Sequence, residues 1–273
     1  MLDVAWALRN FLFWFIVVGV GCWALERLRP WRREQKVLRK GIGQDLFFLV
    51  FNGHYFGILA AAVIAWFAGV LHVDPQGKLQ FSGLVGNWPW VVQFAVCLVT
   101  LDFVEWCVHV LLHRVRWLWR FHKLHHSIEE LDWIGNFRFH FGEIVVYRTL
   151  TFLPLMLLGP RDTVLLATGV FTMTISNLNH ANVKISWGPL RYVLNSPAMH
   201  VWHHDLVKHG RYGQNYAIVF SLWDWLFGTA YWPDDREQPE RLGFKHMKQY
   251  PRGIVGRLLD PFVPKRLRKK RTT

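Results

Sequence analysis

Apolar residues are grouped into long blocks along the chain, and these blocks predict membrane-spanning helices. The blocks at residues 46–71 and 88–112 are each long enough to cross a hydrocarbon core of roughly 30 Å. The block at 11–25 is shorter, but the charged pair Glu26 and Arg27 follows it where a secretory signal would carry a small-residue cleavage site. We therefore expect an uncleaved first span there.

Two shorter apolar runs, at 144–158 and 163–175, are separated by a Gly-Pro-Arg-Asp turn signal at 159–162. Each run is marginal for a full span, so the pair forms either two tilted helices or a re-entrant hairpin. The pattern predicts an all-α protein with four or five membrane spans, or with three spans and a re-entrant hairpin. Because no internal repeat or second soluble domain is visible, we expect one integral membrane domain over 1–273.

Composition and the placement of charge agree with a membrane setting. The chain has 52% hydrophobic residues with 16 Trp and 21 Phe, and Trp concentrates where proteins meet lipid headgroups. The formal net charge is +13, and basic clusters at 27–40, 114–123 and 265–271 each lie beside an apolar block. That placement argues against nucleic acid as a partner. The basic C-terminal tail, 262–273, is expected to lie against anionic lipid or to dock an acidic electron carrier.

The distribution of Lys and Arg between the loops predicts the orientation. The loop after the first block holds seven of these residues, whereas residues 72–87 hold only Lys78. Because short cytoplasmic loops are enriched in Lys and Arg, the first loop should be cytoplasmic, and segments 113–143 and 180–273 should share its side. We expect an integral multi-pass protein with a cytoplasmic C-terminus, in a bacterial inner membrane rather than the endoplasmic reticulum.

Ten of the 14 histidines fall into a pattern that is typical of metal ligands. They form one HxxxH box, two HxxHH boxes and two single positions: His109 and His113; His122, His125 and His126; His200, His203 and His204; and His140 and His180. On a helix, positions i, i+3 and i+4 share a face, so each box should direct two or three imidazoles at one place. The four remaining histidines lack the pattern; we expect His54 to be a buried polar residue and His72, His209 and His246 to lie on the surface.

The number of imidazoles indicates the kind of metal site. Ten neutral nitrogens are too many for one ion, but they suit two ions of five or six coordination that each keep a position for oxygen. Iron fits this ligand set best, and zinc could replace it in a preparation. The acids Asp102, Glu105, Glu143 and Asp205 lie near the ligands in sequence. They either accept the second N–H of an imidazole or pair with nearby arginines.

The motifs around these histidines resemble those of the fatty acid hydroxylase / sterol desaturase superfamily over residues 90–230. The matching stretches are Asp102-Phe103, Glu105-Trp106, residues 118–127, Arg138-Phe139-His140, residues 179–182, Ser196-Pro197, Asn215-Tyr216 and residues 222–229. The resemblance implies an integral membrane, histidine-ligated di-iron oxygenase with about four spans and a cytoplasmic histidine cap. Members use O2 to hydroxylate or desaturate lipids such as sterols and fatty acids. Phe141 and Ala217 depart from the patterns of many relatives, which puts transfer of their substrates in doubt.

The sequence leaves the source of the electrons and the type of oxidation open. Because no GxGxxG follows a strand and no CxxCH is present, electrons must come from a separate cytochrome, ferredoxin or reductase. Hydroxylation and desaturation need the same metal, so the motifs do not separate them. A histidine-rich metal-binding or transport protein is the alternative, but residues 11–71 carry few polar side chains for a path through the bilayer. A zinc hydrolase would need the Glu of HExxH, which is absent.

Overall fold

The structure is a computed structural model that describes residues 10–52, 83–210, 213–233 and 237–264. Within these residues the secondary structure is helical, apart from two isolated β-bridges. The α-helices are α2 (Phe11–Leu28), α3 (Ile42–Val50), α5 (Trp90–Arg114), α6 (Arg116–His122), α7 (Phe141–Leu158), α8 (Asp162–His180), α9 (Pro197–His203), α10 (Leu222–Leu226) and α11 (Ile254–Leu259). The all-α prediction is therefore confirmed for the part of the chain that the structure describes.

Helices α2 and α5 are long and apolar enough to cross a membrane. The α2 helix begins where the side chain of Asn10 accepts a hydrogen bond from the backbone N–H of Leu12 (2.9 Å), and it exposes apolar side chains along its length, with Val20 59% and Trp23 50% exposed. Large apolar side chains on that scale are stable on a surface that faces hydrocarbon rather than water. The first and third predicted spans thus correspond to helices, whereas most of the second, 46–71, lies outside the described residues.

The two shorter apolar runs form separate helices, α7 and α8, of 18 and 19 residues. The chain reverses between them at Gly159, whose φ of +56° lies in the left-handed region that glycine adopts without strain. At 1.5 Å per residue, an 18-residue helix is about 27 Å long, which is close to the thickness of a hydrocarbon core. Each run is therefore a helix of its own, which agrees with both expected arrangements, two tilted helices or a re-entrant hairpin.

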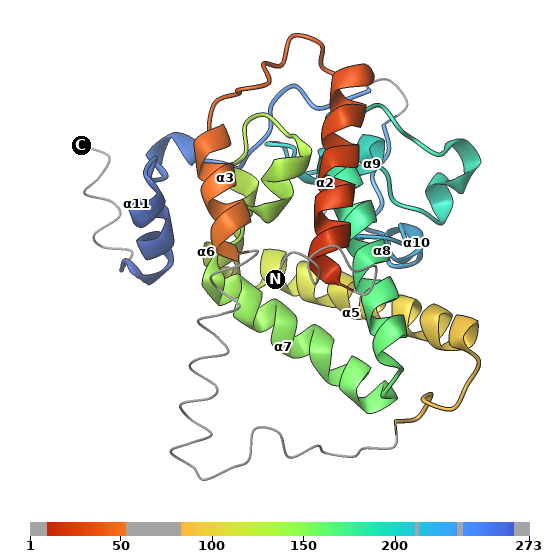
Figure 1. The fold of residues 1–273 in the computed structure, drawn as a ribbon. Coiled ribbons are helices and arrows are strands. Elements are labelled where there is room, and N and C mark those ends of the chain that lie inside the picture. Colours follow the sequence, from red (N-terminus) through yellow and green to blue (C-terminus); the bar gives the residue numbers. More distant parts are fainter. Residues whose placement is uncertain (1–9, 53–82, 211–212, 234–236, 265–273) are drawn as a thin grey trace.

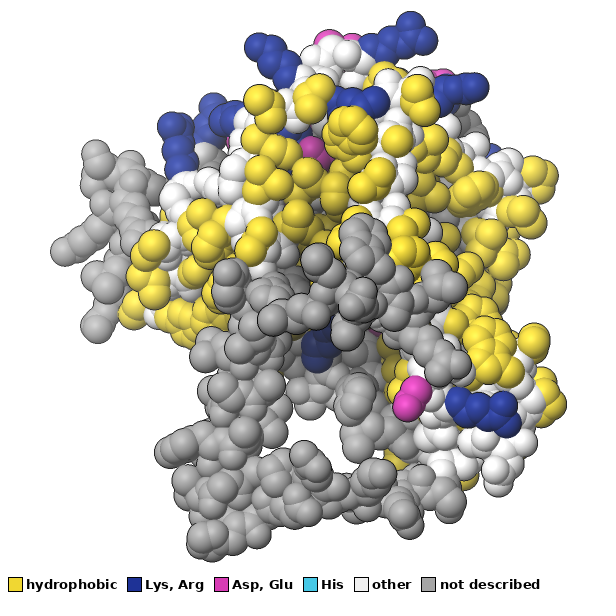
Figure 2. Space-filling view, in the orientation of Figure 1, with side chains coloured by type: hydrophobic (Ala, Val, Ile, Leu, Met, Phe, Trp, Pro, Cys, Tyr) yellow, Lys and Arg dark blue, Asp and Glu magenta, His cyan; other side chains and the backbone are white. Residues whose placement is uncertain are grey.

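Helix α5 lies at the centre of the arrangement and packs against α6, α7 and α8 (Figure 1). Helix α8 also contacts α2 and α9, so it connects the outer helix to the histidine-rich region. Figure 2 shows hydrophobic side chains over the face formed by α2 and α3, while Lys and Arg gather at the end where the loop between these two helices lies. This separation of apolar and basic surface is typical of a protein at a membrane boundary.

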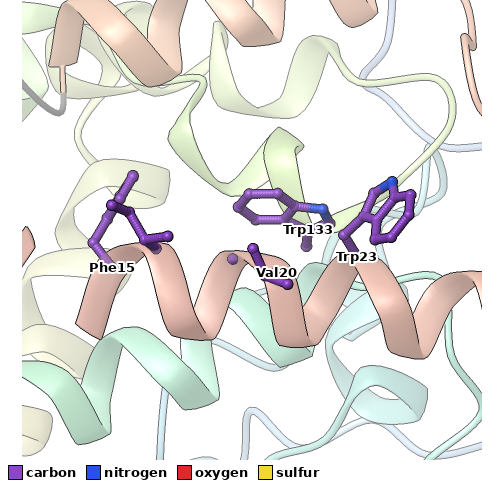
Figure 3. Close-up of a pocket in the computed structure, with 6 residues that line it drawn as sticks. Phe15, Val20, Trp23 and Trp133 are labelled. Atoms are coloured by element: carbon purple, nitrogen blue, oxygen red, sulfur yellow. The ribbon is translucent and has the colours of Figure 1, made fainter. Parts of the chain in front are cut away.

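An apolar groove of about 250 Å³ lies along α2 (Figure 3). Its walls include Phe15, Val20, Trp23 and the indole of Trp133, which comes from the histidine-rich region. A Cβ at Gly19 would come within 2.9 Å of the Trp133 ring, so glycine is what allows this close contact. At this groove the outer, apolar helix α2 therefore packs against the segment that precedes His140.

A buried ionic network fixes the loop between α2 and α3 to the histidine-rich region. Arg39 donates to Asp45 (2.6 Å) and to both carboxylate oxygens of Asp132 (2.5 and 2.6 Å). Arg138 also donates to Asp45 (2.8 Å) and to the backbone oxygen of Ser127 (2.9 Å), directly beside the first HxxHH box. Because these four charged side chains are buried, each depends on its partners to offset the cost of leaving water.

Replacement of Asp45 by Ala should destabilise the fold strongly. It would leave Arg39 and Arg138 buried with fewer partners, at a cost of about 3–5 kcal/mol in the free energy of unfolding. Thermal unfolding of the detergent-solubilised protein measures this loss. The control is Lys40→Ala, which removes an exposed ion pair with Glu129 (3.3 Å) and should change stability by about 1 kcal/mol or less. Equal losses in the two variants would contradict the role of the network.

Candidate metal centre

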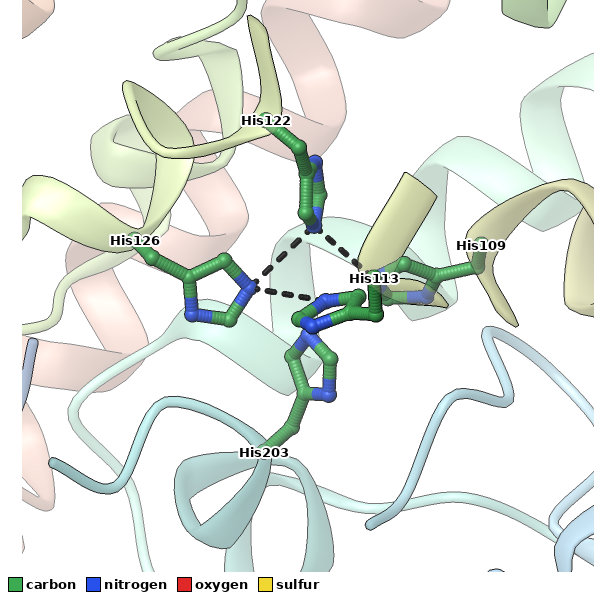
Figure 4. Close-up of side chains that lie close together, drawn as sticks. All are labelled: His109, His113, His122, His126 and His203. Atoms are coloured by element: carbon green, nitrogen blue, oxygen red, sulfur yellow. Dashed lines mark hydrogen bonds between the residues drawn. The ribbon is translucent and has the colours of Figure 1, made fainter. Parts of the chain in front are cut away.

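Five histidine rings converge at the C-terminal end of α5 (Figure 4). They are His109, His113, His122, His126 and His203, and their ring nitrogens lie within 4.8 Å of one another. The Nε2 atom of His122 is 3.2 Å from Nε2 of His109 and 3.1 Å from Nε2 of His126, which in turn is 3.1 Å from Nε2 of His113. We call this group the first cluster.

Four further histidines form a second cluster directly beside the first. They are His125, His180, His200 and His204, all buried, with ring nitrogens within 4.8 Å of one another. The Nε2 atom of His180 is 3.2 Å from Nε2 of His125 and 3.3 Å from Nε2 of His200. The two clusters adjoin, since the ring centroids of His126 and His204 are 4.7 Å apart.

Each HxxHH box supplies both clusters, because the middle histidine of the box, His125 or His203, lies in a different cluster from the other two. In the first box, His122 and His126 enter the first cluster and His125 enters the second. In the second box, His203 enters the first cluster, while the histidines at 200 and 204 enter the second. Each box thus directs two rings at one cluster, within the expected two or three, and its remaining ring at the other. In the first box, helix α6 ends at His122 and a 3-10 turn, His125–Ser127, follows.

Hydrogen bonds on the far side of the rings set which nitrogen faces the cluster. Nδ1 of His109 lies 2.6 Å from the backbone oxygen of Tyr216, and Nδ1 of His203 lies 2.9 Å from that of Gln214. A carbonyl oxygen can only accept, so each Nδ1 must carry the proton. The lone pair of Nε2 is then left to face the cluster, as a metal ligand requires. Nδ1 of His180 makes the same kind of bond to the backbone oxygen of Ser176 (2.9 Å).

The loop that carries these backbone oxygens is held by two buried aspartates. Asp102 on α5 accepts hydrogen bonds from the backbone N–H groups of residues 219–220 (2.7 and 2.9 Å) and from the indole of Trp223 (2.8 Å). Asp224 accepts from the N–H groups of residues 216–217 (both 2.9 Å). Sequence reasoning expected Asp102 either to accept from an imidazole or to pair with an arginine, and it missed Asp224, although both lie in the family-like motifs. Both aspartates contact the loop, so they position the ring of His109 only through the backbone of that loop.

The other three acids expected near the ligands have different positions. Glu143 contacts a cluster member, since its Oε1 accepts from Nδ1 of His122 at 2.6 Å. Asp205 instead accepts from His209, at 2.7 Å, and that histidine belongs to neither cluster. For Glu105, the described residues include no hydrogen bond from its carboxylate to a cluster histidine. Glu143 alone of the three thus orients a cluster ring.

His140 lies outside both clusters, so its expected role as a ligand is not supported by this geometry. Its Nδ1 accepts a hydrogen bond from the backbone N–H of Gly142 (3.0 Å) and so caps the N-terminus of α7. Its Nε2 then carries the proton and donates to the backbone oxygen of Leu258 (2.9 Å). Both ring nitrogens are occupied, which leaves no lone pair for a metal ion.

The histidines outside the pattern are also outside the clusters, as far as the structure describes them. His209 stacks on Tyr231, with ring centroids 3.9 Å apart, and His246 is exposed. His54 and His72 lie outside the described residues. Cluster members thus come from the three boxes and from the single His180, and none of the described histidines outside the pattern joins them.

Burial favours the neutral form of four cluster rings that lie outside the membrane-spanning segments. Burial, followed by repulsion from neighbouring imidazoles, lowers the pKa of His125, His126, His200 and His204 well below the ordinary value. A neutral imidazole has a lone pair on one nitrogen, whereas a protonated one has none. The burial that would penalise a charged histidine thus keeps these side chains in the form that binds metal.

The arrangement of nitrogens fits a metal ion in each cluster. With metal–imidazole bonds of about 2.1 Å, two ligand nitrogens are about 3.0 Å apart at a right angle and about 3.4 Å apart at a tetrahedral angle. The Nε2 separations of 3.1–3.3 Å fall between these values. In addition, Nε2 of His203 and both ring nitrogens of His204 are buried without a hydrogen-bond partner. Such atoms are costly unless a ligand satisfies them.

Comparison with known proteins agrees with this chemistry. The fatty acid hydroxylase family profile matches residues 94–229. The chain is 32% identical over 262 residues to the ornithine lipid hydroxylase OlsE of Rhizobium tropici, covering 93% of this chain and 77% of that protein. It is 29% identical over 139 residues to cholesterol 25-hydroxylase of Homo sapiens, covering 50% of each.

A third relative is alkylglycerol monooxygenase of Homo sapiens, which is 31% identical over 144 residues, covering 52% of this chain and 30% of that protein. No solved structure matches the chain at a significant level. The relatives are hydroxylases and a monooxygenase, and the region that matches the family profile contains both clusters. This chain therefore belongs to the fatty acid hydroxylase / sterol desaturase superfamily and is an oxidoreductase of that superfamily, with a histidine centre suited to iron.

Proposed function

We propose that this protein is a membrane-bound di-iron oxygenase that hydroxylates a lipid with O2. The observation that supports this most directly is the pair of adjoining clusters, with five imidazoles in one and four in the other. Each set can hold one iron ion below six-coordination, which leaves a position for oxygen. Zinc, which needs four ligands in a closed site, would not use both sets in this way.

The residues of the chain have distinct parts in this proposal. The first cluster would hold one iron and the second cluster the other, and bound iron supplies the oxidising power that an unactivated C–H bond requires. Glu143 and the carbonyl oxygens of 214 and 216 hold the ligand rings in their metal-binding tautomer. Buried Tyr216 packs against the rings of His109, His113 and His203 and would help to keep water away from the first cluster.

The proposed topology extends the two candidate spans. Helices α7 and α8 would cross with α2 and α5, and the clusters with the C-terminus would form a cytoplasmic cap. The basic end of the molecule, where the loop between α2 and α3 lies, supports this orientation (Figure 2). A bacterial inner membrane is favoured by the match to a protein of Rhizobium tropici over most of the chain.

Among lipids, we propose an ornithine lipid as the first substrate to test. The match with the ornithine lipid hydroxylase includes helices on both sides of the family region, whereas the match with human cholesterol 25-hydroxylase covers half of the chain. Hydroxylation consumes one O2, two electrons and two protons for each C–H bond that becomes C–OH, with release of water. The electrons come from a separate donor protein. Eight of the nine cluster rings are buried and His113 is half-buried, and the part of the chain that the structure describes offers no second set of polar ligands along a path through the membrane.

Metal analysis of the purified protein should find two iron ions per chain. His126→Ala should lose the iron of the first cluster and keep that of the second, and His200→Ala should do the reverse, since each removes a ligand from one set only. The matched control is His140→Asn, in which the amide oxygen can still cap α7; it should retain both ions. Iron content by mass spectrometry decides this, and loss of one ion from His140→Asn would restore His140 as a ligand.

Glu143→Ala should weaken iron binding by about 10–100-fold, because the ring of His122 loses the carboxylate that orients it. Glu143→Gln should weaken it less, since the amide oxygen still accepts the Nδ1–H while the negative charge is gone. Competition with a chelator measures the affinity, and Glu129→Ala, an exposed acid, is the control. Equal affinities in Glu143→Ala and the unaltered protein would show that the ring needs no such partner.

Lipid extracts from cells that make ornithine lipid should contain a product one oxygen atom heavier when this protein is expressed with oxygen present. His203→Ala should abolish the product while membrane insertion is unchanged, since the ring removed lies in the first cluster. A product two hydrogen atoms lighter would instead identify a desaturase. Absence of both products, with two irons bound, would exclude ornithine lipid as the substrate.

A further inference from the structure

A short path of aromatic side chains connects the first cluster to the surface of the molecule. The ring of Trp119 lies beside two cluster members, with centroid distances of 5.0 Å to His113 and 5.3 Å to His126. On its other side Trp119 meets Phe244 edge-on at 6.0 Å, and Phe244 in turn meets Tyr250 at 5.4 Å. Contact between conjugated rings along this path links the metal ligands to a side chain outside the cluster.

The outer end of the path opens into a hollow of about 990 Å³. Phe244 and Tyr250 both line it, and so does Val201, which belongs to the helix of the second HxxHH box. The segment that carries Phe244 is fixed to that box, because the N–H of Gly243 donates to the backbone oxygen of His204 (2.9 Å). The hollow therefore adjoins the helix of the second HxxHH box, and the hydrogen bond from Gly243 couples its wall to that box.

The hollow is lined by more basic than acidic side chains. Its lining includes six Lys or Arg residues, at 32, 40, 241, 248, 252 and 257, and four Glu residues, at 34, 129, 130 and 240. The segment 241–252, which carries both aromatic side chains, contains four exposed Lys or Arg residues and no acid: Arg241, Lys245, Lys248 and Arg252. Glu129 is paired with Lys40 at 3.3 Å. The stretch of wall that carries the aromatic path is thus basic.

Lys123 contacts both rings of the aromatic pair, Phe244 and Tyr250. Its ammonium lies 5.7 Å from the ring centroid of Phe244 and 5.2 Å from that of Tyr250, within the range of a cation–π contact. Its nitrogen is 3.3 Å from a carboxylate oxygen of Asp260. Because Lys123 directly follows His122, the same turn of chain positions a cluster ring and the aromatic pair.

We propose that this hollow docks an acidic one-electron carrier protein and that Phe244 and Trp119 carry its electrons to the first cluster. The inference rests on the proposed function and names the site of its electron donor. In each docking the carrier is oxidised by one electron and the metal centre is reduced by one. Two dockings supply the two electrons that, with one O2 and two protons, convert C–H to C–OH and water.

An acidic protein fits this hollow better than an anionic membrane surface does. A flat bilayer would meet the acidic side chains at 34, 129, 130 and 240 together with the basic ones. A protein can instead place a convex acidic patch against the basic segment 241–252. Complementary charge of this kind raises the association rate and weakens with salt. Binding to the carrier should therefore depend on ionic strength.

Direct binding tests the docking surface without any turnover. A reduced plant-type ferredoxin, an acidic one-electron carrier, is titrated onto the full-length protein in nanodiscs of zwitterionic lipid. Lys245→Glu combined with Lys248→Glu should weaken binding about tenfold at low salt and flatten the salt dependence. Arg161→Glu, a charge reversal at the turn between α7 and α8, is the control for net charge and should leave the affinity unchanged.

Electron delivery tests the aromatic path. Phe244→Leu keeps an apolar side chain at the wall but removes the ring, so reduction of the iron by bound ferredoxin should slow severalfold while ferredoxin affinity and iron content are unchanged. Dithionite, a small reductant that needs no docking site, should reduce the variant at the normal rate. Tyr192→Leu, which removes an exposed aromatic ring from elsewhere on the surface, is the control and should change neither rate.

The outcomes separate this proposal from the proposed function. A protein that forms product with dithionite but binds ferredoxin equally well with Lys245 and Lys248 reversed has the proposed function and a different docking site. If the two reversals instead abolish binding to anionic vesicles and leave ferredoxin binding intact, the basic segment is a membrane contact and the docking proposal is wrong. A protein that binds two irons and forms no product with either reductant contradicts the proposed function.

Discussion

The hydrogen bonds on the outer nitrogens of the imidazoles are the constraint on which the rest of this structure depends. An imidazole has two nitrogens, and either can carry the proton when the ring is neutral. In His109 and His203 a backbone oxygen accepts from Nδ1, so Nε2 faces inward with its lone pair. In His122 a carboxylate does the same. These acceptors fix the tautomer and the orientation of the three rings before a metal ion binds.

This constraint explains why Asp102 and Asp224 are buried near the metal centre although neither contacts a cluster ring. The oxygen that accepts from His109 belongs to a loop, and a loop holds a position to within a few tenths of an ångström only if its own N–H groups are bonded. Asp102 and Asp224 bond four of them. One aspartate comes from the membrane helix α5 and the other from the short helix α10, so the metal site is assembled by contacts between elements 122 residues apart.

The sequence predicts more about which residues meet than about how they divide. Box spacing identified eight of the nine histidines that converge, the ninth being the single His180, and apolar blocks identified α2, α5, α7 and α8. Spacing did not show that each box divides between two clusters, because periodicity tells which residues share a helix face and not what lies opposite that face. The contacts of His140 with the N–H of Gly142 and the carbonyl of residue 258 are likewise not encoded in a local pattern.

An oxygenase that acts on lipid must meet two incompatible solvents, and the placement of α5 resolves that requirement. The hydrocarbon substrate is concentrated in the bilayer, whereas an electron-carrier protein is confined to water. Helix α5 is apolar enough to cross the membrane, and it ends at His109 and His113 in the first cluster. Just beyond it, Trp119 turns toward the polar side. Under the proposed function and docking site, lipid substrate would approach the clusters from the bilayer, and electrons would approach them through Trp119.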